Sequence, residues 1–317
     1  MTASRVLVVG DANLDLVLRG DVVPRFGQSE QLLEGAELVL GSSAGIVAAG
    51  LARLGVRTAL AARVGNDVLG QRTRELLRAA GVDCARVLSS PEPTGVSVIL
   101  STPDDRAILT FAGAIAALTD GDVRDAVSAL APAHVHVSSL FLTPHVAAAQ
   151  AERLAALRAA GVTTSLDTNW DPAGRWEGVE ACLSHLDLLL PNAAEAMALA
   201  RAAGADPRDA QDAAMRLSAL GPVVVVKDGQ RGGFAVAGDV VVRAPSRPVQ
   251  IVDTTGAGDS FTAGFLAGWL DGLPLPQAVR WGAVAGSLST RGVGGTDGQP
   301  TRGELLAVLG ETDGRQS

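Results

Sequence analysis

The sequence predicts an α/β protein built on a mostly parallel β-sheet with helices on both faces, and three features of the chain support this class. Short apolar runs alternate with amphipathic segments along the 317 residues. The apolar runs are continuous, as in strands that are buried on both faces of a parallel sheet. Several helical segments end in Leu-Gly or Ala-Gly directly before a β-branched run, as in LARLGVRTAL, where the glycine cap returns the chain to the next strand.

The order of these segments predicts one domain over residues 1–310 made of repeated strand and helix units. The runs typical of strands are residues 6–9, 59–64, 96–100, 134–137, 163–166, 186–190 and 223–226. The segments typical of helices are residues 44–54, 71–80, 145–160, 193–203 and 209–220. Residues 311–317 form a polar tail that we expect to be disordered.

Two stretches depart from this rhythm, at residues 12–40 and 93–112. Both have mixed patterns such as SVILSTPDDRAILTF, in which a polar turn at residues 102–105 separates two strand-like runs. We therefore expect antiparallel strands that lie outside the main sheet and form a small β lid.

The composition excludes several classes of partner. A formal net charge of −8 gives no basic surface for nucleic acid or anionic lipid. Cys84 and Cys182 lie far apart, which argues against a disulfide framework, and we interpret both as small buried residues. No signal peptide or membrane-spanning run is visible, so we expect a cytoplasmic protein. Lys227 is the only lysine among 26 basic residues and hence the only candidate for a catalytic lysine.

The segment DTTGAGDSFTAG, at residues 253–264, is the strongest functional signal in the chain. Gly256, Ala257 and Gly258 have little or no side chain, so that successive backbone N–H groups can surround an anion at the start of the apolar helix that follows, which we expect to begin near Gly258. Asp259 would repel such an anion, and its sensible role is to take a proton from a hydroxyl that attacks a phosphoryl group. The simpler interpretation is a tight loop in which Asp259 only caps the helix.

Other phosphate-binding motifs are missing from the sequence. No GxxxxGK[ST] loop occurs, and the first strand is followed by a single glycine in VLVVGDANLD rather than by GxGxxG. This argues against an NAD-linked oxidoreductase.

The segment DTTGAGDSFTAGF resembles the C-terminal signature of the PfkB carbohydrate kinase family, which has the ribokinase-like fold. Further stretches resemble the family's landmarks in the same order: GDANLDLVL (10–18), GSSAGIVAAGLARLG (41–55), VGNDVLGQ (64–71), TGVSVIL (94–100), LLLPNAAEAMAL (188–199) and VVVVKDGQRGGF (223–234). The resemblance implies a three-layer α/β/α domain with a β lid, and a kinase that uses ATP and Mg²⁺.

The resemblance also implies roles for individual residues. It assigns Asp259 as the catalytic base and Gly256, Ala257 and Gly258 as the anion hole. The remaining assignments are Asn192 and Glu195 for Mg²⁺ and phosphate, largely through water; Lys227, Gly229, Arg231 and Gly232 for the nucleotide; Asn13, Asp15, Gly41, Ser42 and Ile46 for the acceptor; and Asp253 and Thr255 for the monovalent cation, such as K⁺, that some members bind. On residues alone, Asn-x-x-Glu is also typical of a helix cap and Asp15 of a solvated turn.

Two departures from the family pattern concern the acceptor. Ile46 and Ile115 stand where the family often has asparagine, and Ser42 replaces a glycine, which argues against ribokinase proper. We expect phosphoryl transfer to a hydroxyl of a sugar or sugar-like molecule. A nucleoside kinase of the same fold and a non-catalytic nucleotide or sugar sensor are the alternatives.

Four further residues are candidates for the rim of the site, and the lid is a candidate for the interface of a dimer. Arg25 and Arg106 could bind a phosphorylated acceptor or could be solvated surface residues. Trp170 and Trp176 could stack on a base, although packing near a loop is the better interpretation. The family often pairs its lids, which makes a homodimer an expectation here.

Overall fold

The computed structural model describes residues 6–28, 30–102 and 106–313 and confirms the α/β class. Within these ranges the main sheet has nine strands in the order β13-β12-β11-β10-β9-β8-β1-β4-β5. Neighbouring strands are parallel except in the antiparallel pairs β11–β12 and β12–β13 at one edge. The strands are β1 (Val6–Val9), β4 (Thr58–Gly65), β5 (Asp83–Ser90), β8 (His134–Ser138), β9 (Thr163–Asp167), β10 (Leu188–Leu189), β11 (Val223–Lys227), β12 (Gly233–Ala237) and β13 (Val240–Ala244).

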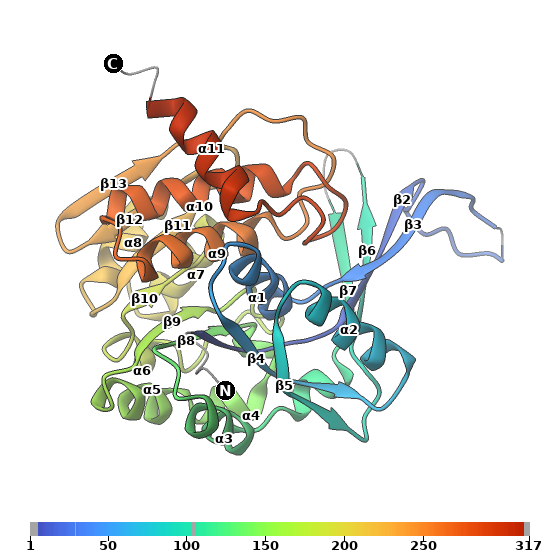
Figure 1. The fold of residues 1–317 in the computed structure, drawn as a ribbon, viewed down its shortest axis with the longest axis horizontal. Coiled ribbons are helices and arrows are strands. Elements are labelled where there is room, and N and C mark those ends of the chain that lie inside the picture. The colour runs from blue at the N-terminus through green and yellow to red at the C-terminus, as the bar shows by residue number, and fades with distance from the viewer. Residues whose placement is uncertain (1–5, 29, 103–105, 314–317) are drawn as a thin grey trace.

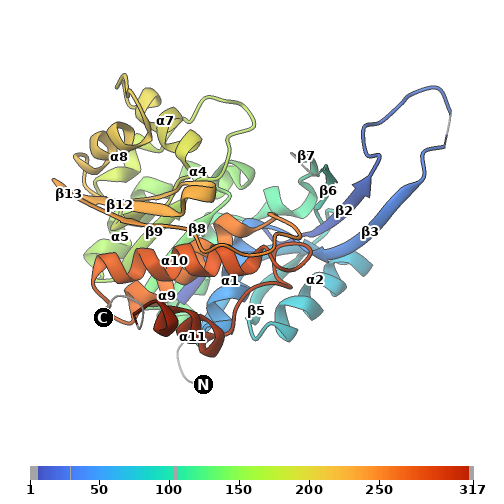
Figure 2. The ribbon, with the colours of Figure 1, turned by 90° about the horizontal axis from the view of Figure 1, so that it is seen from above.

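Helices cover both faces of this sheet and give the expected three layers (Figures 1 and 2). One face carries α1 (Ser43–Arg53), α2 (Val68–Ala79), α9 (Ala257–Leu270), α10 (Leu275–Ser289) and α11 (Arg302–Asp313). The other carries α3 (Asp120–Leu130), α4 (Pro144–Ala148), α5 (Gln150–Ala159), α6 (Glu180–Leu183), α7 (Ala193–Ala202) and α8 (Ala210–Ser218). Short 3₁₀ turns are η1 (Gly113–Ala117), η2 (Leu140–Leu142) and η3 (Gly229–Arg231).

The central strand β1 shows why the sheet needs two helical layers. Its four residues are fully buried. Val6 and Val8 pack in the core under α1 and α9, while Leu7 and Val9 pack in the core on the opposite face. A strand whose side chains alternate between two apolar cores has a continuous apolar sequence, as the pattern predicted.

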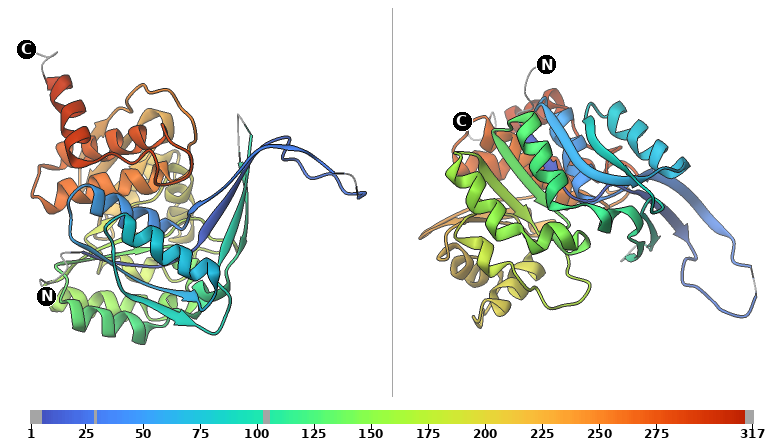
Figure 3. Two further views of the ribbon diagram at one scale, coloured as in Figure 1. Left: turned by 45° about the vertical axis from the view of Figure 1, so that its right-hand side comes forward. Right: turned by 90° about the horizontal axis from the view of Figure 1, so that it is seen from below.

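The lid is a separate four-stranded sheet in the order β3-β2-β6-β7, and it projects from the domain (Figures 1 and 3). Its strands are β2 (Leu14–Gly20), β3 (Leu33–Leu40), β6 (Val96–Ser101) and β7 (Arg106–Phe111). The expectation of antiparallel strands is correct for β2–β3 and β6–β7 but wrong for β2–β6, which pair in parallel. The central pair must be parallel because both strands leave the body of the domain in the same direction.

The base of the lid is held by two stretches that the sequence had singled out separately. Asp67, the N-cap of α2, accepts hydrogen bonds from the backbone N–H of Thr94 at 2.8 Å and from its hydroxyl at 2.5 Å. The Thr94 hydroxyl also accepts from Gly65 N at 2.9 Å. The segments VGNDVLGQ and TGVSVIL therefore meet where β6 enters the lid.

Several helices and strands differ in length from those that the sequence predicted. The helix predicted at 145–160 is interrupted at Ala149, where Arg153 Nη2 donates to the Val146 carbonyl at 3.0 Å in place of a helical bond. The strand predicted at 186–190 is reduced to β10, although Leu190 N still donates to the Leu166 carbonyl at 2.8 Å. The helix α11 continues to Asp313, three residues into the segment predicted as a tail. Residues 314–317, and residues 103–105 of the predicted turn, lie outside the described residues.

Two interpretations from composition can be compared with the structure. Cys84 and Cys182 are both free and buried, which confirms their assignment. Among the helices of the described chain, none has the length and apolarity required to cross a bilayer.

Candidate active site

The segment DTTGAGD forms the loop before α9 and the first turn of that helix. Gly256 is the N-cap with φ +67°, and a Cβ there would lie 2.6 Å from Gly295 Cα, so both backbone conformation and space require glycine. The helix begins at Ala257, one residue before the predicted start. Ala257 N donates to the Thr254 carbonyl at 3.3 Å, whereas helix geometry directs the next amides, of Gly258 and Asp259, out of the N-terminal end.

Asp259 lies in this first turn and is held by a residue from another part of the chain. The hydroxyl of Ser43, the first residue of α1, donates to Asp259 Oδ1 at 2.5 Å. Burial raises the pKa of Asp259 to about 8; the positive charge of Lys227 opposes this effect, and the negative charge of Asp167 adds to it. A carboxyl group that titrates near neutral pH is suited to take a proton during a reaction.

Lys227 lies at the end of β11 and forms a buried ion pair with Asp167 at the end of β9. Burial alone would lower the pKa of Lys227, but Asp167, Glu195 and Asp259 together raise it above its ordinary value. A Cβ on Gly258 would lie 3.5 Å from Lys227 Cδ, so the lysine passes beneath the glycine loop. The resemblance assigned Lys227 to the nucleotide loop, and the structure places its ammonium group within an acidic cluster.

Sequence reasoning missed Asp167, although a signal for it existed. The residue directly follows the apolar run 163–166, and the carboxyl ends of parallel strands are where α/β proteins place their sites. Asp11 was missed for the same reason: it follows β1, is buried, and accepts hydrogen bonds from Ser43 N at 3.2 Å and Ala44 N at 2.9 Å. Asp11 thereby holds the N-terminus of α1.

Asn192 and Glu195 form a complete capping box at the start of α7. Asn192 Oδ1 accepts from Glu195 N at 2.9 Å, and Glu195 Oε2 accepts from Asn192 N at 2.7 Å. The Glu195 side chain is buried, which raises its pKa, while Lys227 opposes that effect. The Asn-x-x-Glu motif therefore forms the helix cap that its residues alone suggested.

The capping box also bears on Mg²⁺. Within the described residues no group of three or more acidic, histidine or cysteine side chains could cage a metal ion. Glu195 provides one buried carboxylate near Lys227 and Asp167. A single carboxylate fits a hydrated Mg²⁺ that would be held chiefly by nucleotide phosphates, because Mg²⁺ keeps several waters and needs few protein ligands.

The predicted nucleotide loop continues from Lys227 through η3. Arg231 is exposed and pairs with Asp228 at 2.7 Å. Gly232 has φ +88°, and a Cβ there would lie 2.2 Å from the Ala244 carbonyl, so the chain can turn into β12 only with glycine. Gly229, with φ +58°, has open space around it. A cavity of about 480 Å³ adjoins this loop and is lined by Asp228, Arg231, Phe234, Arg243 and neighbouring residues.

The predicted acceptor residues gather at the base of the lid. Asn13 Nδ2 donates to Asp15 Oδ1 and to Ser97 Oγ, each at 3.2 Å. Burial raises the pKa of Asp15 to about 7, and the negative charge of Asp11 adds to this effect. A Cβ on Gly41 would lie 2.0 Å from Asp15 Oδ1, so glycine at this position is what makes room for the carboxylate.

The three altered acceptor positions have distinct surroundings. Ser42 has φ +68° and caps α1 by accepting from Gly45 N at 3.0 Å. Ile46 is buried behind the anion loop: a Cβ on Gly295 or Gly256 would lie 2.2 or 3.2 Å from Ile46 Cδ1. Ile115 is buried in η1 next to Gly95.

The residues suggested for a monovalent cation and for the rim of the site lie in different surroundings. Asp253 accepts from Thr255 N at 2.9 Å, from Thr255 Oγ1 at 2.8 Å and from Gly294 N at 2.8 Å, so it holds the two loops together. Arg106 Nη1 donates to Thr254 Oγ1 at 3.0 Å and so links the lid to the loop before the anion hole. Arg25 instead pairs with Asp21 in an exposed part of the lid.

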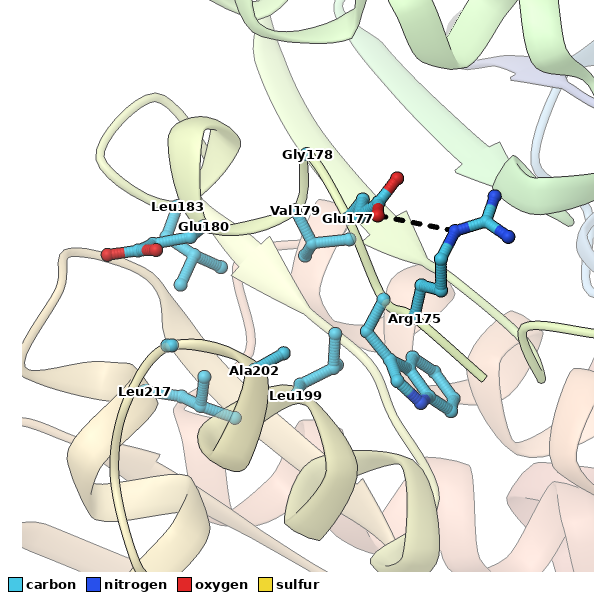
Figure 4. A pocket seen from close by; sticks show the side chains of 11 residues that line it. Arg175, Glu177, Gly178, Val179, Glu180, Leu183, Leu199, Ala202 and Leu217 are labelled. Atoms are coloured by element: carbon cyan, nitrogen blue, oxygen red, sulfur yellow. Dashed lines mark ion pairs between the residues drawn. The ribbon is translucent and has the colours of Figure 1, made fainter. Parts of the chain in front are cut away.

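The two tryptophans differ in exposure. Trp176 is buried, as the packing interpretation predicted, and the ring of Trp170 contacts it edge-on at 5.2 Å while remaining 58% exposed. Trp176 also lines a second cavity of about 240 Å³ (Figure 4). That cavity lies between the loop before α6 and the helices α7 and α8, with the Arg175–Glu177 ion pair at its rim, and Trp176 is the one residue among those lining it that the sequence had singled out.

Comparison with known proteins agrees with this geometry. Residues 3–302 match the family model described as pfkB family carbohydrate kinase. The chain is 31% identical to 2-dehydro-3-deoxygluconokinase of Bacillus subtilis, covering 83% of this chain and 84% of that protein. It is 33% identical to acarbose 7(IV)-phosphotransferase of an Actinoplanes species, covering 89% and 90%.

A solved structure supports the same assignment. Ribokinase of Arabidopsis thaliana, complexed with ribose and ATP, superposes with a TM-score of 0.81 at 26% identity and covers 98% of this chain and 99% of that one. The fold and these likenesses agree, and the chain belongs to the PfkB family of carbohydrate kinases, ATP-dependent transferases whose acceptor is an alcohol group.

Proposed function

We propose that this protein transfers the γ-phosphoryl group of ATP to a hydroxyl of a sugar or sugar-like small molecule, with Asp259 as the base and the amides around Gly256–Gly258 as the anion hole. The proposal rests on whether side chains cap the N-termini of three helices. Ser42 and Asp11 cap α1, and a capping box closes α7, whereas α9 has no side-chain cap. An uncapped helix start built of glycine and alanine, with an acid in its first turn, supports phosphoryl transfer more than packing.

The chemistry follows from the two carboxylate oxygens of Asp259. Its Oδ1 accepts the Ser43 hydrogen bond, which leaves Oδ2 to take the proton of the acceptor hydroxyl. As that proton moves, the acceptor oxygen forms a bond to the γ-phosphorus, the bond to the bridging oxygen of ADP breaks, and the amides at the start of α9 stabilise the charge on the transferred group. Mg²⁺ would be held near Asn192 and Glu195 and would supply charge neutralisation of the phosphates.

The acceptor would lie between Asp259 and the base of the lid. Asn13 and Asp15 would bind its hydroxyls, with Gly41, Ser42 and Ile46 forming the adjoining wall. The Arg106–Thr254 contact supports a lid that closes over the acceptor and excludes water. Gly229, Arg231 and Gly232 would contact the nucleotide. Asp253 and Thr255 would lie beside a bound monovalent cation. Comparing rates of ADP release in potassium chloride and in choline chloride tests this part of the proposal.

The experiment that tests the function is an ADP-release screen against sugars, sugar acids and nucleosides, followed by the Asp259→Asn variant with the acceptor found. We expect turnover to fall by about 10²-fold or more, with ATP affinity largely unchanged, because the base is lost and the anion hole remains. Asp271→Asn, at the far end of α9, is the matched control and should retain turnover. Near wild-type turnover in Asp259→Asn would refute the assignment of the base.

The alternatives give different results in the same screen. A nucleoside kinase releases ADP only with nucleosides. A sensor binds ATP but releases no ADP with any acceptor. An acceptor that raises ADP release from the wild type but not from Asp259→Asn would exclude the sensor.

We also propose that the lid pairs two copies of this chain. Strand register places Leu16, Leu38, Val98 and Leu109 in one row on the lid face opposite Asp15. Leu38 and Leu109 are 44% and 59% exposed, which leaves an apolar face for a second copy to cover. Light scattering should report a dimer that Leu38→Asp and Leu109→Asp convert to a monomer; a monomeric wild type at tens of micromolar contradicts the proposal.

A further inference from the structure

Gln299 lies buried between α1 and α9, in the segment that follows α10. Its Nε2 donates to the Ile46 carbonyl in α1 at 2.9 Å and to Ser260 Oγ in α9 at 3.1 Å. Because the Ile46 carbonyl can only accept, the NH₂ end of the amide must face it. The Oε1 atom has no hydrogen-bond partner among the described residues.

That arrangement is unfavourable for packing alone. A buried amide oxygen without a partner lowers the stability of the fold, and an apolar side chain of similar length would avoid this loss. Below the amide the two helices already touch: a Cβ on Gly50 would lie 2.7 Å from Ala263 Cβ and 2.8 Å from Gln299 Nε2. The two helices are therefore in direct contact beside Gln299, and its amide adds a polar link to a contact that apolar atoms already make.

The position of the two acceptors explains what the amide does. Ile46 lies one turn after Ser43, and Ser260 directly follows Asp259. The Ser43–Asp259 hydrogen bond joins the tips of α1 and α9, and Gln299 joins the same two helices immediately beneath that bond. The same segment also reaches the anion loop, where Gly294 N donates to Asp253 and Gly295 lies against Gly256.

We infer that Gln299 is a positioning residue for phosphoryl transfer: it fixes α1 against α9 so that the Ser43 hydroxyl stays on Asp259. The inference rests on the proposed function and adds to it a residue that touches neither nucleotide nor acceptor. It joins the acceptor loop at the start of α1 and the anion hole at the start of α9 into one rigid unit.

The test compares Gln299→Met with the wild type in three measurements. We expect kcat/KM at pH 7 to fall about five- to tenfold and the rise of kcat/KM with pH to move to higher pH. The melting temperature should change little, because removal of the unpaired Oε1 offsets the loss of the hydrogen bond to Ser260. Gln299→Leu is the second variant if methionine at this position disturbs folding. A residue with a purely structural role would lower the melting temperature and leave the pH profile in place, and that outcome overturns the inference.

A double-mutant cycle with Ser43→Ala shows whether the two residues act together. If Gln299 acts through the Ser43–Asp259 bond, Gln299→Met should reduce kcat/KM by less than twofold in the Ser43→Ala background; full additivity overturns the inference. Failure of the proposed function looks different, because in that case the wild type releases no ADP with any acceptor or Asp259→Asn retains turnover.

Discussion

The Ser43–Asp259 hydrogen bond predicts both where kcat/KM should titrate and how that titration should move. Burial raises the pKa of Asp259 to about 8, so at pH 7 about one-tenth of the free protein holds the ionised base, and at pH 6 about one-hundredth. We expect kcat/KM to increase about tenfold from pH 6 to pH 7 and to level above about pH 9, because this ratio reports ionisations of the free enzyme.

Replacing Ser43 with alanine removes a donor that favours the ionised carboxylate. A hydrogen bond to a charged group contributes about 1.5–3 kcal/mol, which corresponds to a pKa increase of about 1–2 units. Ser43→Ala should therefore lower kcat/KM at pH 7 by about 10- to 100-fold and recover much of the loss near pH 9.5. Ser43→Thr keeps the hydroxyl and should remain close to the wild type.

The assay is ADP release at subsaturating acceptor between pH 5.5 and 9.5, with circular dichroism at each pH to confirm that both variants stay folded. The sign is fixed by the structure: loss of a donor to the carboxylate can only move the profile upward in pH. A kcat/KM that does not change between pH 6 and pH 8, or a Ser43→Ala profile that coincides with the wild type, would refute the reasoning.

Three further predictions concern the surroundings of the site. Lys227→Met leaves Asp167 buried without its ion-pair partner and should lower the free energy of unfolding by about 3–5 kcal/mol in urea titrations; a change below about 1 kcal/mol contradicts the pairing. Gly41→Ala places a Cβ 2.0 Å from Asp15 Oδ1 and should raise the acceptor KM with ATP affinity unchanged, which isothermal titration and steady-state kinetics can separate. Burial lowers the pKa of His136 to about 3, below its ordinary value near 6.5, so the stability that its neutral form contributes is complete above pH 6.5 and is lost as pH falls toward 3. Relative to His136→Gln, the free energy of unfolding of the wild type should fall by about 2 kcal/mol between pH 6.5 and pH 5. Equal pH dependence of the two proteins would show that this histidine titrates normally.

The architecture was predictable because it depends on local patterns. Continuous apolar runs predicted the buried parallel strands, and the position of the small residues in DTTGAGD predicted where α9 begins to within one residue. The strands β5, β12 and β13 were not predicted. The sequence of β5, DCARVLSS, is mixed and resembles a loop, whereas β12 (GFAVA) and β13 (VVVRA) are short apolar runs that the pattern could have identified. The break at Ala149 was not predictable either, because it depends on Arg153 contacting the Val146 carbonyl.

The parts of the site that escaped prediction are contacts between distant segments. Ser43 and Asp259 are 216 residues apart, and Lys227 and Asp167 are 60 residues apart. Nothing in the local sequence of either partner indicates the other. Asp11 and Asp167 could have been identified as candidates by their place directly after apolar strands, but only the fold shows that one holds α1 and the other pairs with the lysine.

The charges at the carboxyl end of the sheet explain why a base near neutral pKa belongs in this site. Asp167, Glu195 and Asp259 all act on the single ammonium group of Lys227, so negative charge exceeds positive charge before any phosphate arrives. In the free protein burial favours the protonated form of Asp259, the charges of Asp167 and Asp11 add to this effect, and the charge of Lys227 opposes it. A nucleotide bound with Mg²⁺ would still carry net negative charge and would also favour the protonated form. We therefore expect kcat at saturating ATP and Mg²⁺ to titrate at higher pH than kcat/KM, since the phosphates beside Asp259 disfavour its ionised form. Coincident profiles would show that the nucleotide-bound site keeps the charge balance of the free protein.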